Sequence, residues 1–328
     1  MKQDADDMTL KPFDFSQILE EVPEIGKFAV KIDSFSFEPP IDSSDVEPSL
    51  WQKLACLIKE KYDDYDGFII LHGTDTMAYS ASALSFMLDG LTKPVIFTGS
   101  QLPIGVPRTD GRENLISAVE IASAKDENGN PAVPEVCVCF ASLLMRGNRS
   151  TKVNSEGFRA FQSPNFPPLA EAGINIRYNN EYIRKPNDWL QSLSINTNLD
   201  TRVSILKIHP GITPQVVRNI LCGEETRAVI METYGSGNAP SGKWFLDILE
   251  EAKAMDKIVV NVTQCLAGTV NMNLYATGKH LEESGVIDGN DLTTESALAK
   301  LFYLMGKSQD NAWVRAMMGR NLKGEISK

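Results

Sequence analysis

The stretch Gly67-Phe68-Ile69-Ile70-Leu71-His72-Gly73-Thr74-Asp75-Thr76 decides the fold class, because an apolar run ends abruptly there in small polar residues. The run 67–71 predicts a strand covered on both faces, and the segment 77–88 that follows has apolar residues at helical spacing. A strand, a turn and a helix in this order are typical of an open parallel sheet. Ligands collect at the carboxyl ends of strands in such a sheet, so Thr74 and Asp75 stand at a candidate site.

A second interpretation is that Thr74 and Asp75 only cap the helix. Small polar residues are common at tight strand-to-helix turns, where their side chains accept hydrogen bonds from the first free N–H groups. Taken alone, the motif favours capping. The remainder of the chain changes that balance.

The length and charge of the chain limit what it can be. Its 328 residues suffice for two α/β domains, because single cores seldom grow past about 250 to 300 residues. A net charge of -11 and a pI near 4.9 argue against a nucleic-acid or membrane partner, since both need clustered Lys and Arg, and favour a small-molecule ligand. No apolar run approaches the roughly 20 residues that span a bilayer, and the acidic start lacks a signal-peptide core, so we expect a cytoplasmic protein.

The cysteines and one glycine-rich turn offer little for a metal or a nucleotide. Five cysteines form no CxxC pair, and only three histidines accompany them, so no metal and no cofactor is expected. Cys137 and Cys139 share one face of a predicted strand, where free Cys packs as a small hydrophobe. In the run 235–240, Pro240 replaces the third glycine of a dinucleotide loop, which favours a simple turn.

Alternating strand and helix patterns predict a larger N-terminal and a smaller C-terminal α/β domain. Strands at 67–71 and 94–97 with a helix between them form a βαβ unit, hence a doubly wound, mostly parallel sheet, and the smaller domain is expected to be flavodoxin-like. We place the domains at 1–186 and 202–328, because the linker 187–201 loses periodicity and gains Asn, Asp, Ser and Thr. Further expected elements are strands at 28–32, 136–140, 203–208, 228–231 and 257–262, helices from Pro48, at 244–254 and at 294–305, and a polar loop at 146–152.

No Ser-His-Asp triad is evident, because the G-x-S-x-G elbow is absent and the histidines are scattered, with His72 expected only to fill space. Thr74, Asp75 and Lys152 remain, all predicted in loops after strands. A lysine desolvated beside a carboxylate can deprotonate a threonine hydroxyl or a water. This set predicts acyl transfer without histidine.

Four motifs in combination identify a family. They are His72-Gly73-Thr74-Asp75-Thr76-Met77, Thr98-Gly99-Ser100-Gln101-Leu102-Pro103, Arg146-Gly147-Asn148-Arg149-Ser150-Thr151-Lys152 and Asn261-Val262-Thr263-Gln264-Cys265. Together they closely resemble the cytosolic, type I bacterial L-asparaginases, over residues 10 to 325. The resemblance implies a two-domain α/β fold, a homo-oligomer that is usually a dimer of dimers, and hydrolysis of L-asparagine to L-aspartate and ammonia without a cofactor.

The resemblance also implies roles for individual residues. One matched set is catalytic, and its aspartate also meets the substrate α-ammonium group. A second set binds substrate, because hydroxyl and N–H donors suit a carboxylate and an amide. The catalytic positions are Thr74, Asp75 and Lys152, and the substrate-binding positions are Thr74, Asp75, Ser43 and Ser44 for the α-carboxylate segment, and Ser100 beside the side-chain amide.

The sequence departs from the family pattern at its start. Family members begin with an apolar strand and a Thr-Gly-Gly-Thr-Ile turn whose first Thr is the usual acyl-forming nucleophile, whereas Met1 corresponds to the Met just beyond that turn. A start assigned too late explains this better than an impaired protein, because every later motif persists and loss of a buried strand would severely destabilise the sheet. We expect slow turnover or none from the chain that begins at Met1.

Two alternatives and one regulatory expectation complete the interpretation. The first alternative is a non-catalytic amino-acid-binding or regulatory protein that kept the pocket. The second is an amidotransferase subunit that acts on glutamyl-tRNA, which the acidic balance disfavours. Glu232 stands where asparagine-activated members carry an Arg, so a second asparagine carboxylate would meet a like charge, and strong cooperativity is not expected.

Overall fold

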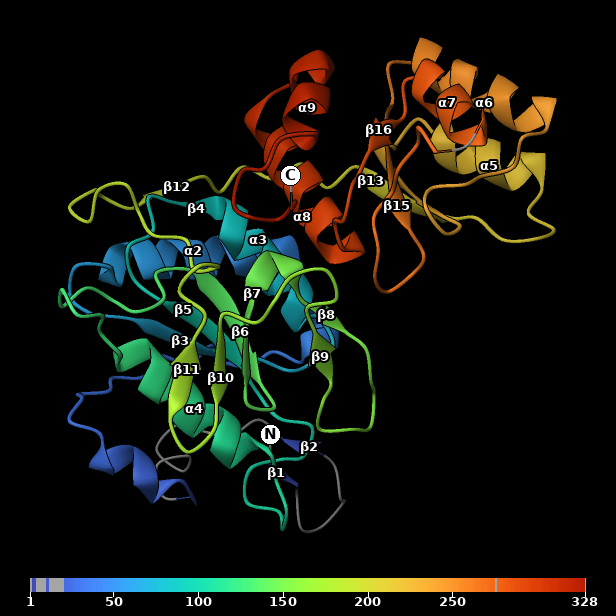
Figure 1. Cartoon of the computed structure of the whole chain (residues 1–328). Helices are drawn as coiled ribbons and strands as arrows, with labels where there is room; N and C mark the ends of the chain where they lie inside the picture. Colours follow the sequence, from blue (N-terminus) through green and yellow to red (C-terminus); the bar gives the residue numbers. More distant parts are fainter. Residues whose placement is uncertain (1, 4–9, 12–20, 275, 328) are drawn as a thin grey trace. The chain divides into compact units, whose positions relative to one another are not determined.

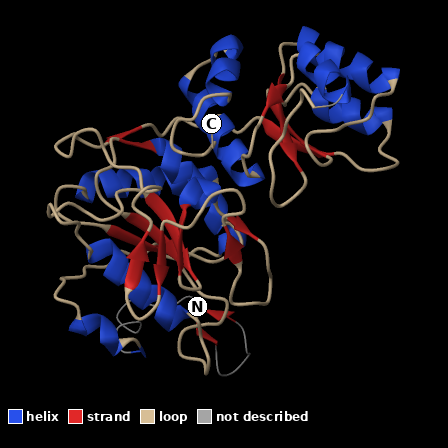
Figure 2. Ribbon diagram, in the orientation of Figure 1, coloured by secondary structure: helices blue, strands red, loops and turns tan. Residues whose placement is uncertain are grey.

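The computed structural model describes residues 2–3, 10–11, 21–274 and 276–327, and the chain divides into two compact units (Figures 1 and 2). The first comprises Met1–Ser163 and Pro167–Ile195, and the second comprises Pro164–Phe166 and Asn196–Lys328. Each unit has its own sheet and its own helices, so the expected two-domain α/β class is confirmed. The domain limits at 186 and 202 stay a prediction.

The first unit is built on a six-stranded sheet of order β11-β10-β7-β6-β5-β3. The half of the sheet from β3 to β6 is parallel, and the half from β7 to β11 is antiparallel. The parallel half therefore supplies the carboxyl edge at which α/β proteins bind ligands. The strands are β3 (Phe68–Leu71), β5 (Val95–Thr98), β6 (Val136–Phe140), β7 (Leu143–Arg146), β10 (Ala170–Ala172) and β11 (Ile176–Tyr178).

Helices cover both faces of this sheet (Figure 1). α2 (Pro48–Lys61) begins at a proline, whose fixed φ suits the first helical position, and buries a stripe that includes Trp51. α2 and α3 (Met77–Met87) lie on one side of the sheet, whereas α4 (Gly111–Ser123) lies on the other. α3 is buried along almost its whole length, as a helix between a sheet and a second helix must be.

Two expectations about the first unit are wrong. The segment 28–32 forms no strand; its Phe28 and Ile32 pack instead against a small cluster made of Val22, Ile25 and two α4 residues, Leu115 and Val119. The strand β3 is not fully buried as expected, because its first three residues are only half-buried and Leu71 is 41% exposed. In the described parts of the chain no strand pairs with the outer edge of β3. Alternating apolar residues become a strand only where a neighbour satisfies their backbone groups.

The second unit contains a four-stranded parallel sheet whose strands follow the chain order β13-β14-β15-β16. α5, α6 and α7 lie on one face and α8 on the other, with α9 packed on α8 (Figure 1). The apolar core under α5 and α6 includes Leu206, Val229 and Phe245. The elements are β13 (Val203–Lys207), β14 (Ala228–Thr233), β15 (Ile258–Thr263), β16 (Ile287–Asp288), α5 (Pro214–Leu221), α6 (Lys243–Ala254), α7 (Ala276–Glu283), α8 (Thr294–Lys307) and α9 (Asn311–Met318).

Short elements connect these layers. β4 and β12 pair with each other inside the first unit, as do β8 and β9. The short elements are β1 (Lys2–Gln3), β2 (Leu10–Lys11), η1 (Pro23–Lys27), η2 (Ser43–Asp45), β4 (Leu88–Asp89), η3 (Gly147–Arg149), β8 (Thr151–Lys152), β9 (Phe161–Gln162) and β12 (Ser194–Ile195).

A buried ion pair holds the last residues of the chain against α8. Lys300 Nζ lies 2.7 Å from Glu325 Oε1, and neither side chain is exposed to solvent. Lys300 also donates to the carbonyl of Met318, while the Glu325 carboxylate accepts the N–H groups of Leu322 and Lys323. The two charges thus have the additional hydrogen bonds that a buried ion pair needs.

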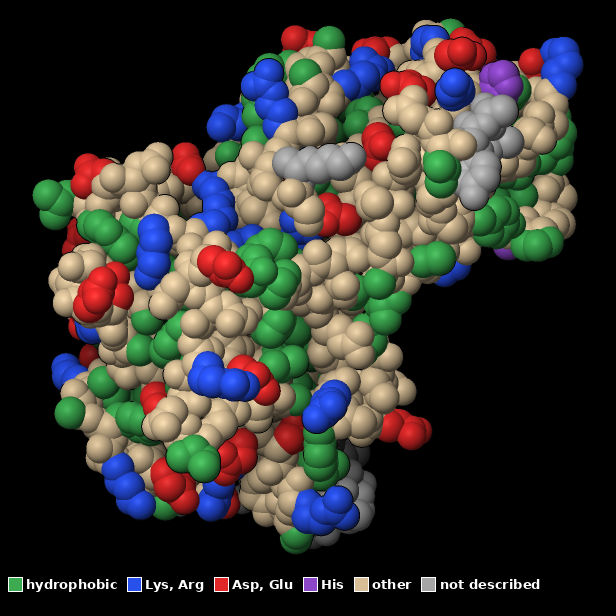
Figure 3. All heavy atoms as spheres, viewed as in Figure 1, with side chains coloured by type: hydrophobic (Ala, Val, Ile, Leu, Met, Phe, Trp, Pro, Cys, Tyr) green, Lys and Arg blue, Asp and Glu red, His purple; other side chains and the backbone are tan. Residues whose placement is uncertain are grey.

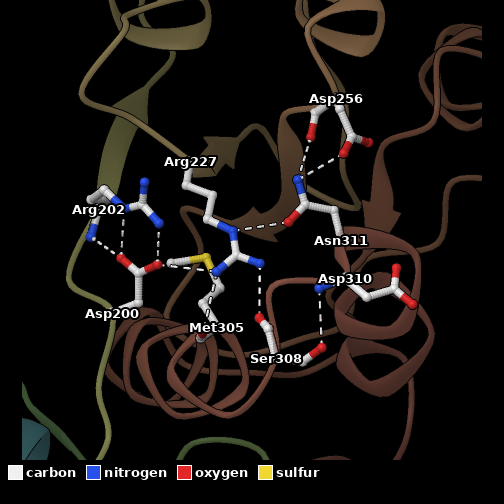
Figure 4. A network of polar contacts seen from close by, with 8 residues as sticks. All are labelled: Asp200, Arg202, Arg227, Asp256, Met305, Ser308, Asp310 and Asn311. Carbon is white, nitrogen blue, oxygen red and sulfur yellow. Dashed lines mark hydrogen bonds and ion pairs between the residues drawn. The ribbon is translucent and has the colours of Figure 1, made fainter.

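A second polar network surrounds Arg227, the residue just before β14 (Figure 4). Its guanidinium donates to Asp200 Oδ2 at 3.0 Å, to Asn311 Oδ1 at 2.9 Å and to the carbonyls of Met305 and Ser308. Hydrogen bonds from Arg202, with help from Arg227, lower the pKa of Asp200 to about 2. The network joins β14 to the chain segment before β13 and to the ends of α8 and α9.

Replacing Arg227 should destabilise the second unit far more than replacing Arg202, although both pair with Asp200. The Arg227 side chain is 8% exposed and that of Arg202 is 52% exposed. We expect Arg227→Met to lower the free energy of unfolding by about 3 kcal/mol, because four acceptors each lose a hydrogen bond, and Arg202→Met by less than about 1 kcal/mol. Urea unfolding followed by circular dichroism measures both, and equal losses would contradict the assignment.

Candidate active site

The parallel pairing of β3 and β5 places two polar turns side by side. Leu71 pairs with Thr98 as the last residue of each strand, and the N–H of His72 still donates to the carbonyl of Thr98 at 2.9 Å. The turn 73–76 leads into α3, and the turn 99–103 follows β5. Their side chains therefore emerge at the same edge of the sheet, as the sequence predicts for parallel strands.

The segment that carries Lys152 is not the polar loop expected at 146–152. It forms η3 and β8, and Asn148, Arg149 and Ser150 are buried. Arg146, just before η3, donates to Glu135 Oε2 at 2.6 Å and to the carbonyl of Tyr182 at 2.7 Å. Polar residues can be buried in this way when they are hydrogen-bonded, which a composition of charged and small residues does not reveal.

The three expected catalytic residues lie together. Lys152 Nζ is 2.8 Å from Thr74 Oγ1 and 2.7 Å from Asp75 Oδ1, so one amino group bridges the hydroxyl and the carboxylate. The Lys152 side chain is 20% exposed and that of Asp75 is 59% exposed. The carboxylate therefore faces solvent, where a ligand can reach it, while the ammonium lies behind it. This arrangement can hold, donate or accept a proton at Thr74 Oγ1.

The three expected substrate-binding serines differ in their surroundings. The Ser43 hydroxyl donates to Asp75 Oδ2 at 3.4 Å, which brings it to the site. The Ser44 hydroxyl and N–H both donate to Asp42 Oδ1 at 2.8 Å, which holds the η2 turn. Ser100 lies in the turn after β5, and among the described residues no hydrogen bond joins its side chain to Thr74, Asp75 or Lys152. The roles of all three stay a prediction.

Gln101 is a member of the site that the sequence reasoning did not single out. Its Oε1 accepts the Thr74 hydroxyl at 3.2 Å, and its Nε2 donates to the carbonyl of Gly157 at 3.2 Å. The carbonyl fixes the orientation of the amide, because a flipped amide would oppose two oxygens. Asp110 in turn accepts the backbone N–H groups of Gln101 and Leu102. The only signal in the sequence was the place of Gln101 in the motif Thr98–Pro103.

Two glycines allow the close approach of the turns. A Cβ on Gly73 would lie 2.4 Å from Ser43 Oγ, and a Cβ on Gly99 would lie 2.3 Å from the carbonyl oxygen of His72. The second contact is with backbone and cannot be relieved by a side-chain rotation. Gly99 therefore fixes how near the two turns can come.

The described residues hold no metal-type cluster and no membrane-type helix. No group of three or more His, Cys, Asp or Glu side chains within them is placed to hold a metal ion. Cys139 is buried, and its burial raises the thiol pKa to about 12. No described helix combines the length and the apolar character that crossing a bilayer requires. Acidic and basic side chains are interspersed over the face drawn in Figure 3.

Two α/β units, with threonine, lysine and aspartate at the carboxyl edge of a parallel sheet, define the class of protein. The family profile described as Asparaginase, N-terminal, matches residues 1–184, and the one described as Glutaminase/Asparaginase C-terminal domain matches residues 202–318. The chain belongs to the asparaginase family.

Individual relatives agree with this family. The chain is 47% identical over 305 residues to L-asparaginase 1 of Escherichia coli K12, covering 93% of this chain and 86% of that protein. It superposes on the crystal structure of L-asparaginase I from Vibrio cholerae with a TM-score of 0.87 at 42% identity, covering 96% and 92% of the two chains. It is also 35% identical over 327 residues to a glutamyl-tRNA(Gln) amidotransferase chain of Sulfurisphaera tokodaii, covering 95% and 69%.

Gly99→Ala should destabilise the first unit, because the new Cβ would collide with the His72 carbonyl and push β3 away from β5. We expect a loss of about 2 to 4 kcal/mol in the free energy of unfolding, the range of a severe steric change in a packed interior. Gly26→Ala is the matched control, since a Cβ there meets nothing within 4 Å. Urea unfolding that gave equal midpoints for the two variants would refute the close approach.

Proposed function

We propose that this protein hydrolyses L-asparagine to L-aspartate and ammonia. The observation that carries the proposal is the Lys152 amino group, which bridges Thr74 Oγ1 and Asp75 Oδ1 at 2.8 and 2.7 Å. The fold and family of the chain support the proposal, since L-asparaginases are among its relatives both by sequence and by structure.

The chemistry is acyl transfer at an amide carbon. An oxygen activated by Lys152 adds to the carbon, the C–N bond breaks, and the proton taken from the oxygen passes to the leaving nitrogen, which departs as ammonia. If that oxygen belongs to Thr74, the product is an ester that water then cleaves to release the acid. If it belongs to a water beside Thr74, the acid forms directly.

The hydrogen bonds around Thr74 define what must change for the reaction. In the structure Lys152 donates to Thr74 Oγ1, and the Thr74 hydroxyl donates to Gln101. Before Thr74 can lose its proton to Lys152, the hydroxyl must turn away from Gln101 and Lys152 must present a free lone pair. Gln101 therefore holds the resting orientation of the hydroxyl.

Charge complementarity supports an amino-acid substrate. The exposed Asp75 carboxylate suits the α-ammonium group of the substrate. In the structure its Oδ2 accepts a long hydrogen bond of 3.4 Å from the Ser43 hydroxyl. Ser43 and Ser44 are proposed to hold the α-carboxylate, and Ser100 to line the side-chain amide. Hydroxyl and N–H donors at these positions match the acceptors of such a ligand. A homo-oligomer, either a dimer or a dimer of dimers, in the cytoplasm completes the proposal.

The first experiment is ammonia release from L-asparagine by a preparation whose intact mass shows where the chain begins. Release by the chain that starts at Met1 would mean that Thr74 and Lys152 suffice as the reacting set. Calorimetric binding of asparagine without ammonia release would favour the non-catalytic alternative. Activity that required glutamyl-tRNA would favour the amidotransferase alternative, to which the relative from Sulfurisphaera tokodaii gives some support.

In a preparation that releases ammonia from asparagine, Lys152→Met should lower kcat/KM for asparagine by about 1,000-fold, because it removes the group that moves the Thr74 proton. Lys185→Met is the control: Lys185 donates to the carbonyl of Ala132 at 2.9 Å, and its contacts do not include the Thr74 set. Ammonia release measures both variants. A Lys152→Met enzyme as active as the Lys185→Met enzyme would remove Lys152 from the mechanism.

Saturation with asparagine should be hyperbolic. Glu232 accepts a hydrogen bond from Thr294 Oγ1 at 2.7 Å and lies 3.5 Å from Lys207 Nζ, so both of its oxygens have partners. A second asparagine carboxylate at this position would be repelled. Initial rates over a wide range of asparagine concentrations give the Hill coefficient, and a sigmoidal curve would refute the expectation.

A further inference from the structure

We infer that His72 is a positioning residue that fixes the Gly73–Thr74 peptide through a one-way hydrogen-bond chain from Trp51. The inference rests on the proposed function, because it assigns His72 to the reaction that Thr74 is proposed to perform. It replaces the expectation that His72 only fills space.

The hydrogen-bond chain has three links, which join α2, α3 and the turn after β3. Trp51 Nε1 donates to Ser80 Oγ at 2.9 Å, Ser80 Oγ lies 2.9 Å from His72 Nε2, and His72 Nδ1 lies 2.6 Å from the carbonyl oxygen of Gly73. The His72 ring also meets the Phe97 ring edge-on, with centroids 5.7 Å apart. Both ring nitrogens thus have a partner, and the ring plane is set by packing.

The chemistry of the end groups fixes the direction of the two outer hydrogen bonds. The indole of Trp51 can only donate, so Ser80 accepts from it, and the carbonyl of Gly73 can only accept, so His72 Nδ1 carries a proton and donates to it. In a neutral ring Nε2 then has no proton and accepts a hydrogen bond from the Ser80 hydroxyl. Burial lowers the pKa of His72, which agrees with a neutral ring.

The hydrogen-bond chain ends at the peptide group that precedes the Cα atom of Thr74. The Gly73 carbonyl belongs to the Gly73–Thr74 peptide bond, so its direction sets the plane from which the Thr74 side chain projects. On the Cα side, Ser43 packs closely on Gly73, since a Cβ on Gly73 would lie 2.4 Å from Ser43 Oγ. His72 and Ser43 together hold the turn, and the 2.8 Å approach of Thr74 Oγ1 to Lys152 Nζ depends on it.

His72 is not itself placed to act as a general base. Its Nε2 faces Ser80 on α3, and its Nδ1 is used by the backbone carbonyl that follows it. A base needs a free nitrogen within reach of the reacting proton. The residue acts on Thr74 through the Gly73 peptide, which predicts an effect on turnover more than on substrate binding.

Ser80→Ala tests the middle of the chain without touching the turn. Loss of one neutral hydrogen bond in a positioning chain should lower kcat by about three- to tenfold and leave KM within about twofold. Ser85→Ala is the matched control, because Ser85 lies in the same helix, is buried and, within the described residues, donates its hydroxyl to the carbonyl of Ala81. Equal kcat values for the two variants, or a loss confined to KM, would overturn the inference.

A second pair of variants keeps the test independent of folding defects at Ser80. His72→Asn retains an N–H that can reach the Gly73 carbonyl, whereas His72→Leu has none. We expect His72→Asn to recover most of the kcat that His72→Leu loses, with similar circular dichroism spectra for both. Identical kcat values for these variants would contradict a role through the Nδ1 hydrogen bond.

The tautomer of His72 gives a readout that needs no activity. Two-bond ¹⁵N–¹H correlation spectra of the imidazole should report a neutral ring with its proton on Nδ1, and a proton on Nε2 would overturn the inference. If this tautomer is found and neither this chain nor one extended at its N-terminus releases ammonia from asparagine, the proposed function fails and the hydrogen-bond chain stands. If ammonia is released and the proton is on Nε2, the reverse holds.

Discussion

The register between β3 and β5 is the constraint on which the site depends. Leu71 and Thr98 end their strands at the same level, so the turn that carries Thr74 and the turn that carries Gln101 start side by side. A slip of one residue would send each side chain of the strand to the opposite face. Gly99 sets the minimum distance between the turns, because its missing Cβ is what lets the His72 carbonyl approach. Backbone geometry, rather than any single side chain, thus brings the reacting groups together.

Lys152 reaches the same edge by a different route. After β6 the chain turns back as the antiparallel strand β7, and Arg146 at its end is tied to Glu135, in the segment just before β6. The side chains of this pair are 4% and 7% exposed, so either charge alone would be costly to bury. The pair fixes the path of η3 and β8, and thereby the place from which Lys152 extends. Arg146 of the structural ion pair and Lys152 of the ion pair in the candidate site thus lie only a few residues apart in the sequence.

Much of this could be predicted from the sequence, because long apolar runs and spaced motifs carry the signal. The strands at 136–140 and 203–208 and the helix that begins at Pro48 followed from periodicity, and Thr74, Asp75 and Lys152 followed from motifs. The segment 28–32 has the same alternation but forms no strand, since pairing depends on a neighbour that local sequence does not encode. The short strands β10 and β11 carry too few residues to show a period.

The missed members of the site share a physical reason. Gln101 and His72 act through hydrogen bonds to groups 27 and 8 residues away, which are Thr74 and Ser80. A glutamine or a histidine is compatible with many surroundings, so its identity does not reveal its partner. Burial was misjudged in the same way at 146–152, where the polar residues pair with groups brought in by the fold. Sequence patterns therefore predict periodic secondary structure well but do not reveal which polar groups will pair in the folded protein.

The buried pair of Lys300 and Glu325 has a consequence for how the end of this chain can vary. Deleting the last four residues would remove Glu325 and leave the ammonium of Lys300 in the interior without a counter-charge, a change that costs several kcal/mol. Adding residues after Lys328 removes neither charge. Among natural variants, additions should therefore accumulate at this terminus, whereas deletions that remove Glu325 should be eliminated. For the same reason an affinity tag belongs after the final residue and should not replace the residues before it.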